Sequence, residues 1–189
     1  MHPIYPILSQ SKARLNSRLA NCPSSLRNAF HEALYAAVHS FTSLTTASHE
    51  NPNSKRAANL LIAATFNSPF NQPLSTSLVH LQALILLAIE ADYRSPAALR
   101  SPRSVSLGSA IGLAYALKLH VHSDKVSDDP DSDENLGRRI WWSLVIMDRW
   151  HASSTSSPLL IPDGSVVVYP EDQALLGDSL YHLARRSCY

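Results

Sequence analysis

The stretch that decides the fold is residues 137–150, which read GRRIWWSLVIMDRW. From Ile140 to Met147 only Ser143 is polar, a pattern typical of a helix that neighbouring segments enclose on every side. Burying these seven large apolar side chains stabilises a fold by about 10 to 20 kcal/mol before chain entropy is subtracted, at about 1.5 to 3 kcal/mol each. We therefore expect a central helix over residues 134–153, with Glu134 and Arg138 placed for an ion pair one turn apart.

One carboxylate interrupts the apolar face of this helix. Asp148 follows Trp141 by seven residues and so lies on the same face. An unpaired carboxylate there would cost several kcal/mol. We expect its partner to come from another segment, either Arg103, Lys118 or the backbone amides of a loop, with the adjacent Arg149 pointing elsewhere.

Hydrophobic periodicity predicts helices along most of the chain. The stripe of residues 24–41 includes Val38, that of residues 54–66 includes Leu60, and residues 74–93 are apolar on nearly every side. Additional helices are expected over residues 8–19, 103–120 and 173–186. The sequence thus predicts an all-α fold, an irregular multi-helix bundle of six to seven helices, in a single domain of residues 1–189.

Small residues recur every four positions on the helix expected over residues 103–120. Ser104, Gly108, Gly112 and Ala116 form this ridge. Such a ridge would let another backbone approach closely in the core. A membrane-spanning role is disfavoured, because the longest uninterrupted apolar runs are seven residues and a bilayer needs about 20.

The net charge of +1 hides one acidic segment, residues 124–134. It holds six acids and one base, which leaves nine acids and fifteen bases in the remainder. We expect a solvated loop here, so that removing Asp129 and Asp131 together would change stability by less than about 1 kcal/mol. The diffuse basic remainder gives no patch for a polyanion.

Neither catalytic nor metal-binding patterns are complete. Asp129, Asp131 and Asp133 match the first three ligands of a calcium loop, but positions six and twelve of that loop fall on Glu134 and Ile140. The pair His120 and His122 has only Asp124 as a nearby third ligand, and two cysteines are too few for a structural zinc site. The chain has no Gly-rich phosphate loop, Gly-x-Ser-x-Gly or His-Glu-x-x-His. We expect no cofactor, no metal and no enzymatic activity.

The order of motifs over residues 110–170 resembles the fungal-specific transcription factor domain, the region downstream of the binuclear zinc cluster in fungal regulators. Family members typically carry Leu-Gly-Leu-His at a helix end, a variable acidic loop, Arg-Arg-x-Trp-Trp followed by Asp-Arg, and a Gly-Arg-Pro turn. The matching residues here are Leu117 to His120, Arg138, Arg139, Trp141, Trp142, Asp148, Arg149, Pro158 and Tyr169-Pro170. Weaker similarity extends back to Leu78. Ser156-Ser157 stands where the family has Gly-Arg.

The resemblance implies a regulatory and protein-interaction domain of a nuclear transcription factor. Its partners would be the transcription machinery or a second copy, with a small-molecule effector held among the helices as a further partner. DNA would be contacted only through a zinc-cluster module, which is absent from residues 1–189, so the chain would be an incomplete version of such a regulator. The alternative is a degenerate or truncated paralogue that acts only as a helical interaction scaffold.

Overall fold

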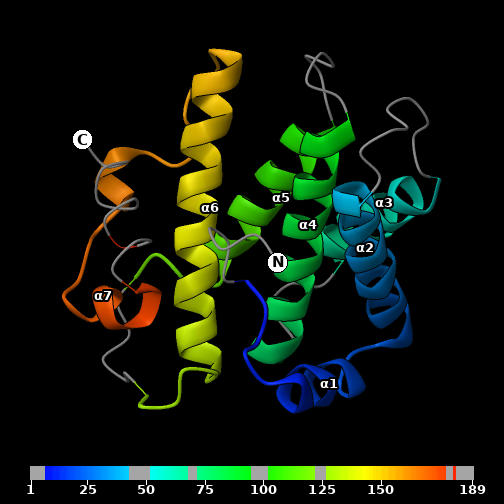
Figure 1. Cartoon of the computed structure of the whole chain (residues 1–189), viewed down its shortest axis with the longest axis horizontal. Helices are drawn as coiled ribbons and strands as arrows, with labels where there is room; N and C mark the ends of the chain where they lie inside the picture. Colours follow the sequence, from blue (N-terminus) through cyan, green and yellow to red (C-terminus); the bar gives the residue numbers. More distant parts are fainter. Residues whose placement is uncertain are drawn as a thin grey trace. The chain divides into compact units, whose positions relative to one another are not determined.

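The computed structural model describes residues 7–42, 52–67, 72–94, 102–121, 127–177 and 181. These residues form helices joined by turns and contain no strand (Figure 1). The helices are α1 (Lys12–Ala20), α2 (Ser24–Thr42), α3 (Pro52–Asn67), α4 (Leu74–Arg94), α5 (Pro102–Ala116), α6 (Asp133–Thr155), the single 3-10 turn η1 (Asp163–Ser165) and α7 (Glu171–Leu176). The predicted all-α class is confirmed.

The chain divides into two compact units. One comprises residues 16–113 and the other residues 1–15 together with 114–189. We call them the α2–α4 unit and the α6 unit after the helices at their centres. The single domain expected from the sequence stays a prediction.

Helix α4 is the core of the α2–α4 unit. It packs against α2 and α3, which also contact each other. Every residue from Thr76 to Ala91 is buried, as the apolar pattern on all sides predicts. By length and composition the window Leu74–Ala91 could cross a bilayer, but 89% of it is buried inside the structure, which is the environment of a core helix.

A histidine joins α4 to α3. The imidazole Nε2 of His80 lies 2.9 Å from the backbone carbonyl of Leu61 and donates to it. Burial lowers the pKa of His80, although the Leu61 carbonyl favours the protonated ring. A buried ring that stays neutral can hold this contact without a counterion.

Two residues of the predicted apolar stripes are on the surface. Val38 on α2 is 54% exposed and Leu60 on α3 is 45% exposed. On α2 the buried set includes Ala29 and Ala36, so the buried face is displaced toward small side chains. Alanine lets α2 approach its neighbours closely, and the larger Val38 then falls on the edge of the contact.

The predicted ridge of small residues on α5 is wrong where the structure describes it. Gly112 and Ala116 are exposed, and a Cβ added at Gly108 or Gly112 would meet no heavy atom within 4 Å. The buried residues of α5 are instead Ser106, Leu107, Ala110, Ile111, Leu113 and Ala114. Small residues permit close packing of helices, but burial of apolar surface is what drives packing. The face of α5 with the larger apolar side chains is therefore the buried one.

Helix α5 ends earlier than its periodicity predicts, and the helix predicted over residues 173–186 is interrupted at Gly177. Tyr181, beyond this break, is again helical, and its amide donates to the carbonyl of Gly177. At the end of α5, the amide N–H of Leu119 donates to the carbonyl of Ala114 and that of Lys118 donates to Tyr115, a Schellman arrangement. At the end of α7, Gly177 has a φ of 74° and its amide donates to Gln173. The leucines at 180 and 183, expected in the last helix, lie outside the described residues.

Two residues other than glycine, Lys118 and Ser156, have positive φ in the described part of the chain. Lys118 has a φ of 57° and Ser156, which ends α6, has a φ of 53°. The left-handed region is costly for residues with a Cβ and is the usual place of glycine at helix ends. These are the positions of the glycines in the Leu-Gly-Leu-His and Gly-Arg-Pro patterns, so backbone conformation accounts for both glycines in the motif.

We predict that Lys118→Gly and Ser156→Gly each stabilise the chain by about 0.5 to 1 kcal/mol, because relief of the left-handed strain exceeds the added entropy of the unfolded glycine. Urea unfolding measures the difference. Ala63→Gly is the control, at an exposed helical position of α3, and it should destabilise by about 1 kcal/mol. If both end-of-helix variants were destabilised like the control, the backbone assignment would be wrong.

Candidate functional site

Helix α6 carries the motif residues and is buried along most of its length. Trp141, Trp142, Leu144 and Asp148 are all 0% exposed, and α6 packs against α7. Ser132 caps the start of the helix, and its hydroxyl accepts from the backbone amide of Asn135 at 3.1 Å. The prediction of an enclosed central helix, with Trp141 and Asp148 on the same buried face, is confirmed.

The loop before α6 is ordered by its own side chains. The side-chain amide of Asn135 donates to the carbonyl oxygens of Ser127 at 2.7 Å and Asp129 at 2.8 Å. The carboxylate of Asp129 accepts from the amide of Asp131 and pairs with Arg14. These bonds fold residues 127–132 back over the first turn of the helix, so the loop serves as a cap.

Asp131 is the buried centre of that cap. Its carboxylate accepts from the backbone amides of Gln10 at 2.9 Å and Ser11 at 2.7 Å, and from Nη2 of Arg139 at 3.1 Å. The Arg139 and Asp131 side chains are 1% and 5% exposed. The expectation of a solvated acidic loop is therefore wrong at this residue, since sequence spacing does not show that the N-terminal segment covers it.

Opposing effects act on the protonation of Asp131. Burial by itself would raise the pKa of this carboxyl, but the amides of Gln10 and Ser11 and the guanidinium of Arg139 together lower it below its ordinary value. The carboxylate is thus held in its charged form by three donors. The ion pair fixes both the start of α6 and the segment before α1.

Arg138 anchors the segment after α6. Its guanidinium binds both carboxylate oxygens of Asp172, each at 2.7 Å, and donates to the carbonyl of Val167 at 2.7 Å. It also lies over the rings of Trp142 at 5.2 Å and Tyr169 at 5.0 Å from their centroids. The expected pair with Glu134 is replaced by this bidentate one, because a fork of donors matches a buried carboxylate better than a helical neighbour on the surface.

Asp148 finds its partners in the loop after α6. The backbone amides of Leu160 at 3.1 Å and Ile161 at 2.9 Å donate to its two oxygens. Of the partners that the sequence left open, loop amides are the correct one. Arg149 does not point elsewhere: it pairs with Asp148 at 3.3 Å and donates to the carbonyl of Ile161 at 2.8 Å.

Arg149 also binds a residue two positions beyond Ile161 in the same loop. Nη2 of Arg149 binds the carboxylate of Asp163 at 2.7 Å, in η1. The dipeptide Asp148-Arg149 therefore offers acceptors to two amides and donors to a carbonyl and a carboxylate. Pro158, in the same connection, is exposed, and its ring restrains the turn that brings residues 160–163 back to the helix.

An aromatic cluster lies at the turn after α5. The ring of His120 is 4.9 Å from that of Tyr115 and 5.8 Å from that of Trp141, and Tyr115 and Trp141 are 5.4 Å apart, all between centroids. The left-handed conformation of Lys118 turns the chain so that His120 comes back over Tyr115. His120 is thus part of an aromatic contact, and its proposed metal partners, residues 122 and 124, lie outside the described part of the chain.

Sequence comparison places these features in a known family. Residues 1–181 match the profile of the fungal specific transcription factor domain. The chain belongs to this family. It is a family of transcription factor domains and not of enzymes.

A curated relative covers almost the whole chain. An uncharacterized transcriptional regulatory protein of Schizosaccharomyces pombe is 41% identical over 197 residues, which include 99% of this chain. The chain spans only 22% of the length of that relative. No solved structure matches.

In this fungal transcription factor domain, the motif residues act as three clamps on α6. Arg139 holds the N-terminal segment through Asp131, Arg138 holds residues 167–172, and Asp148 with Arg149 holds residues 160–163. The side-chain partners that the sequence did not reveal are Asp131, Asp163 and Asp172. Of these, only Asp172 carried a local signal, because Tyr169 and Pro170 before it belong to the family pattern.

None of these clusters resembles a metal site. Within the described residues no three His, Cys, Asp or Glu side chains are placed to hold an ion. The calcium-like triplet is divided, because Asp131 is taken up by Arg139 and two amides while Asp129 pairs with Arg14. Cys22 is buried, donates its thiol to the carbonyl of Arg18 and has a pKa raised by burial, which disfavours the thiolate that zinc requires.

We predict that Asp131→Ala destabilises the chain by about 3 to 5 kcal/mol, because it leaves the guanidinium of Arg139 buried and unpaired. This reverses the expectation drawn from the sequence for the acidic loop. Asp128→Ala is the matched control, an exposed aspartate of the same loop, and should change stability by less than about 0.5 kcal/mol. Urea unfolding of the two variants measures the difference. Equal and small losses of stability would contradict the role of Asp131 as the buried partner of Arg139.

We also predict a pH signature for this carboxyl. Because the folded pKa of Asp131 is below its unfolded value, its contribution is present above the unfolded pKa of about 4 and is lost as pH falls through the folded pKa. The stability difference between the wild type and Asp131→Asn should therefore be largest near neutral pH and shrink below about pH 4. Thermal unfolding of both proteins from pH 7 to pH 3 tests this, and a pH-independent difference would contradict it.

Proposed function

We propose that this chain is a regulatory and protein-interaction domain of a fungal zinc-cluster transcription factor, acting in the nucleus in regulation of DNA-templated transcription. The family match over residues 1–181 and the transcriptional relative support it. The role is that of a folded module which contacts other proteins. DNA contact belongs to a zinc-cluster module, and zinc would be held there.

The observation that carries this proposal is the use of the motif arginines. The guanidinium groups of Arg138, Arg139 and Arg149 are each paired with carboxylates, and the side chains are at most 11% exposed. An arginine that binds the DNA backbone or a base edge has to present its donors to the nucleic acid. The motif therefore supports a folded interaction domain better than a DNA-reading surface.

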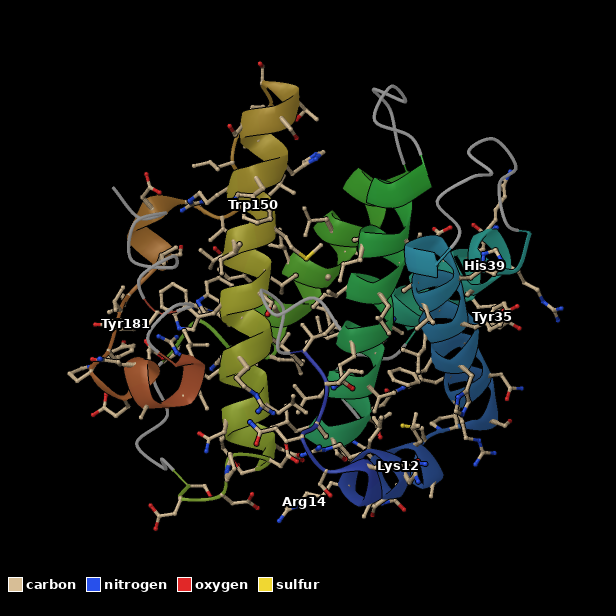
Figure 2. All side chains as sticks on the ribbon, viewed as in Figure 1. Lys12, Arg14, Tyr35, His39, Trp150 and Tyr181 are labelled. Carbon is tan, nitrogen blue, oxygen red and sulfur yellow. The ribbon has the colours of Figure 1, made fainter. Side chains whose placement is uncertain are left out.

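Helix α2 offers a surface suited to a protein partner. Tyr35 is 63% exposed and Val38 is 54% exposed, beside His39, whose ring lies 5.9 Å from that of Tyr35 (Figure 2). No exposed residue of α2 from Ser24 to His39 is a Lys, Arg, Asp or Glu. Arg27 and Glu32 on the same helix are half-buried. The exposed positions themselves, with a tyrosine and a valine among them, fit a partner that presents an apolar surface, since aromatic residues are enriched and charges depleted at interface centres.

The test fuses the chain to an unrelated sequence-specific DNA-binding domain and measures transcription of a reporter that carries its site. We predict that the fusion changes reporter output relative to the DNA-binding domain alone, and that Tyr35→Glu with Val38→Glu reduces the change at least several-fold. Charge placed at an apolar contact costs the desolvation of an unpaired carboxylate. Thermal unfolding checks that both variants remain folded.

The control for added charge is Ser25→Glu with Asn28→Glu, two exposed positions on the same helix, which should keep the output. Reporter output equal to that of the DNA-binding domain alone, with the chain folded, would overturn the transcriptional role and favour the alternative of a degenerate helical scaffold. Equal loss in both double variants would show that the contact is not at Tyr35 and Val38.

A further inference from the structure

Three polar atoms of the aromatic cluster are buried without a protein partner. They are the hydroxyl of Tyr115, Nδ1 of His120 and the indole Nε1 of Trp141, and none of them makes a hydrogen bond to a described protein group. The rings that carry them contact one another. Trp141 is 0% exposed, so its indole N–H is shielded from bulk solvent. Other buried polar atoms of the described residues, such as the indole Nε1 of Trp142, also lack a partner. These three differ because the rings that carry them contact one another.

The chemistry of the three atoms specifies what could satisfy them. The indole N–H only donates, the tyrosine hydroxyl donates or accepts, and Nδ1 of His120 does either according to its tautomer. A single oxygen can meet two or three such groups, as a buried water typically does with about three hydrogen bonds. None of the three rings has to carry a charge, because phenol and indole are uncharged and imidazole has a neutral form. A charged ligand would therefore have no opposite charge in the cluster, and burying it would cost far more than burying a neutral dipole.

We propose that Tyr115, His120 and Trp141 form a binding site for one uncharged, hydrogen-bonding oxygen, either an ordered water or the carbonyl or hydroxyl oxygen of a small neutral molecule. The site is built by the turn that ends α5, because the left-handed Lys118 brings His120 back toward Tyr115, while α6 supplies Trp141. It stands apart from the three clamps and does not depend on the transcriptional role, which the reporter fusion tests separately.

The sign of one substitution distinguishes an occupied site from an empty one. If an oxygen bonds Tyr115, Tyr115→Phe removes a hydrogen bond and lowers the melting temperature of the full chain, by about 2 to 4 °C for a protein of this size. If nothing bonds the hydroxyl, the same change removes an unsatisfied buried group and raises the melting temperature. Tyr35→Phe, on an exposed tyrosine, is the control and should have almost no effect. An unchanged or raised melting temperature for Tyr115→Phe overturns the proposal.

Nuclear magnetic resonance of the indole N–H groups identifies the source of the oxygen. The Trp141 resonance is assigned by its loss in Trp141→Phe, with Trp150→Phe as the control for an exposed tryptophan. Cross-relaxation between the Trp141 indole proton and water supports an ordered water. A saturable shift of the same resonance with acetamide, and not with acetate of nearly the same shape, supports a small neutral ligand.

Both outcomes support the site, and they separate its two sources. Absence of both signals in the folded wild type overturns it. A stronger response to acetate than to acetamide would also overturn it, because the oxygen would then belong to an anion. None of these readouts depends on reporter output, so failure here leaves the proposed function standing and the reverse holds as well.

Discussion

A largely buried helix, α6, carries charged side chains, and this constrains the segments around it in the α6 unit. Arg139, with a side chain 1% exposed, and Asp148, fully buried, are both away from solvent, where an unpaired charge would cost several kcal/mol. Each therefore needs a specific donor or acceptor from outside the helix. Asp131 pairs with Arg139, and the backbone amides of Leu160 and Ile161 donate to Asp148. The positions of the cap, the N-terminal segment and the following loop all depend on meeting this requirement.

Such pairs contribute more to the choice of one structure than to net stability. Replacing a buried ion pair by apolar residues is often neutral, whereas removing one partner is strongly destabilising. The clamps fix the position of each flanking segment along α6. If the loop after α6 were shifted by one residue, different backbone amides would face Asp148. The bidentate pair of Arg138 with Asp172, between the rings of Trp142 and Tyr169, adds a geometric requirement of the same kind.

The motif arginines of α6 bind carboxylates of the same domain. A run of arginines in a transcription factor invites the idea of a DNA contact, yet here the three guanidinium groups face carboxylates of their own unit. The motif describes how a helical domain holds its flanking segments. These arginines are therefore engaged within the domain by its own carboxylates.

The sequence by itself determined that the chain is helical and that α4 and α6 are interior. The apolar runs of residues 74–93 and 140–147 have no polar side to give to solvent, so α4 and α6 had to be interior wherever their neighbours lay. The need of Asp148 for a partner, with loop amides among the candidates, also followed from its place on an apolar face. Both conclusions depend only on the spacing of residues along a helix and on the solvation of their side chains, which can be read from the sequence.

The tertiary structure alone decided which groups meet. From the sequence, Asp131 is one acid among several in a solvated loop. In the structure it is buried because Gln10, Ser11 and Arg139 contact its carboxylate. The ridge of Gly108 and Gly112 looked ready for close packing and is not used, and Arg138 chose Asp172 over Glu134. Each of these depends on a contact between residues far apart along the chain, and the free energy of such a contact is set by burial and geometry that spacing in the sequence does not encode.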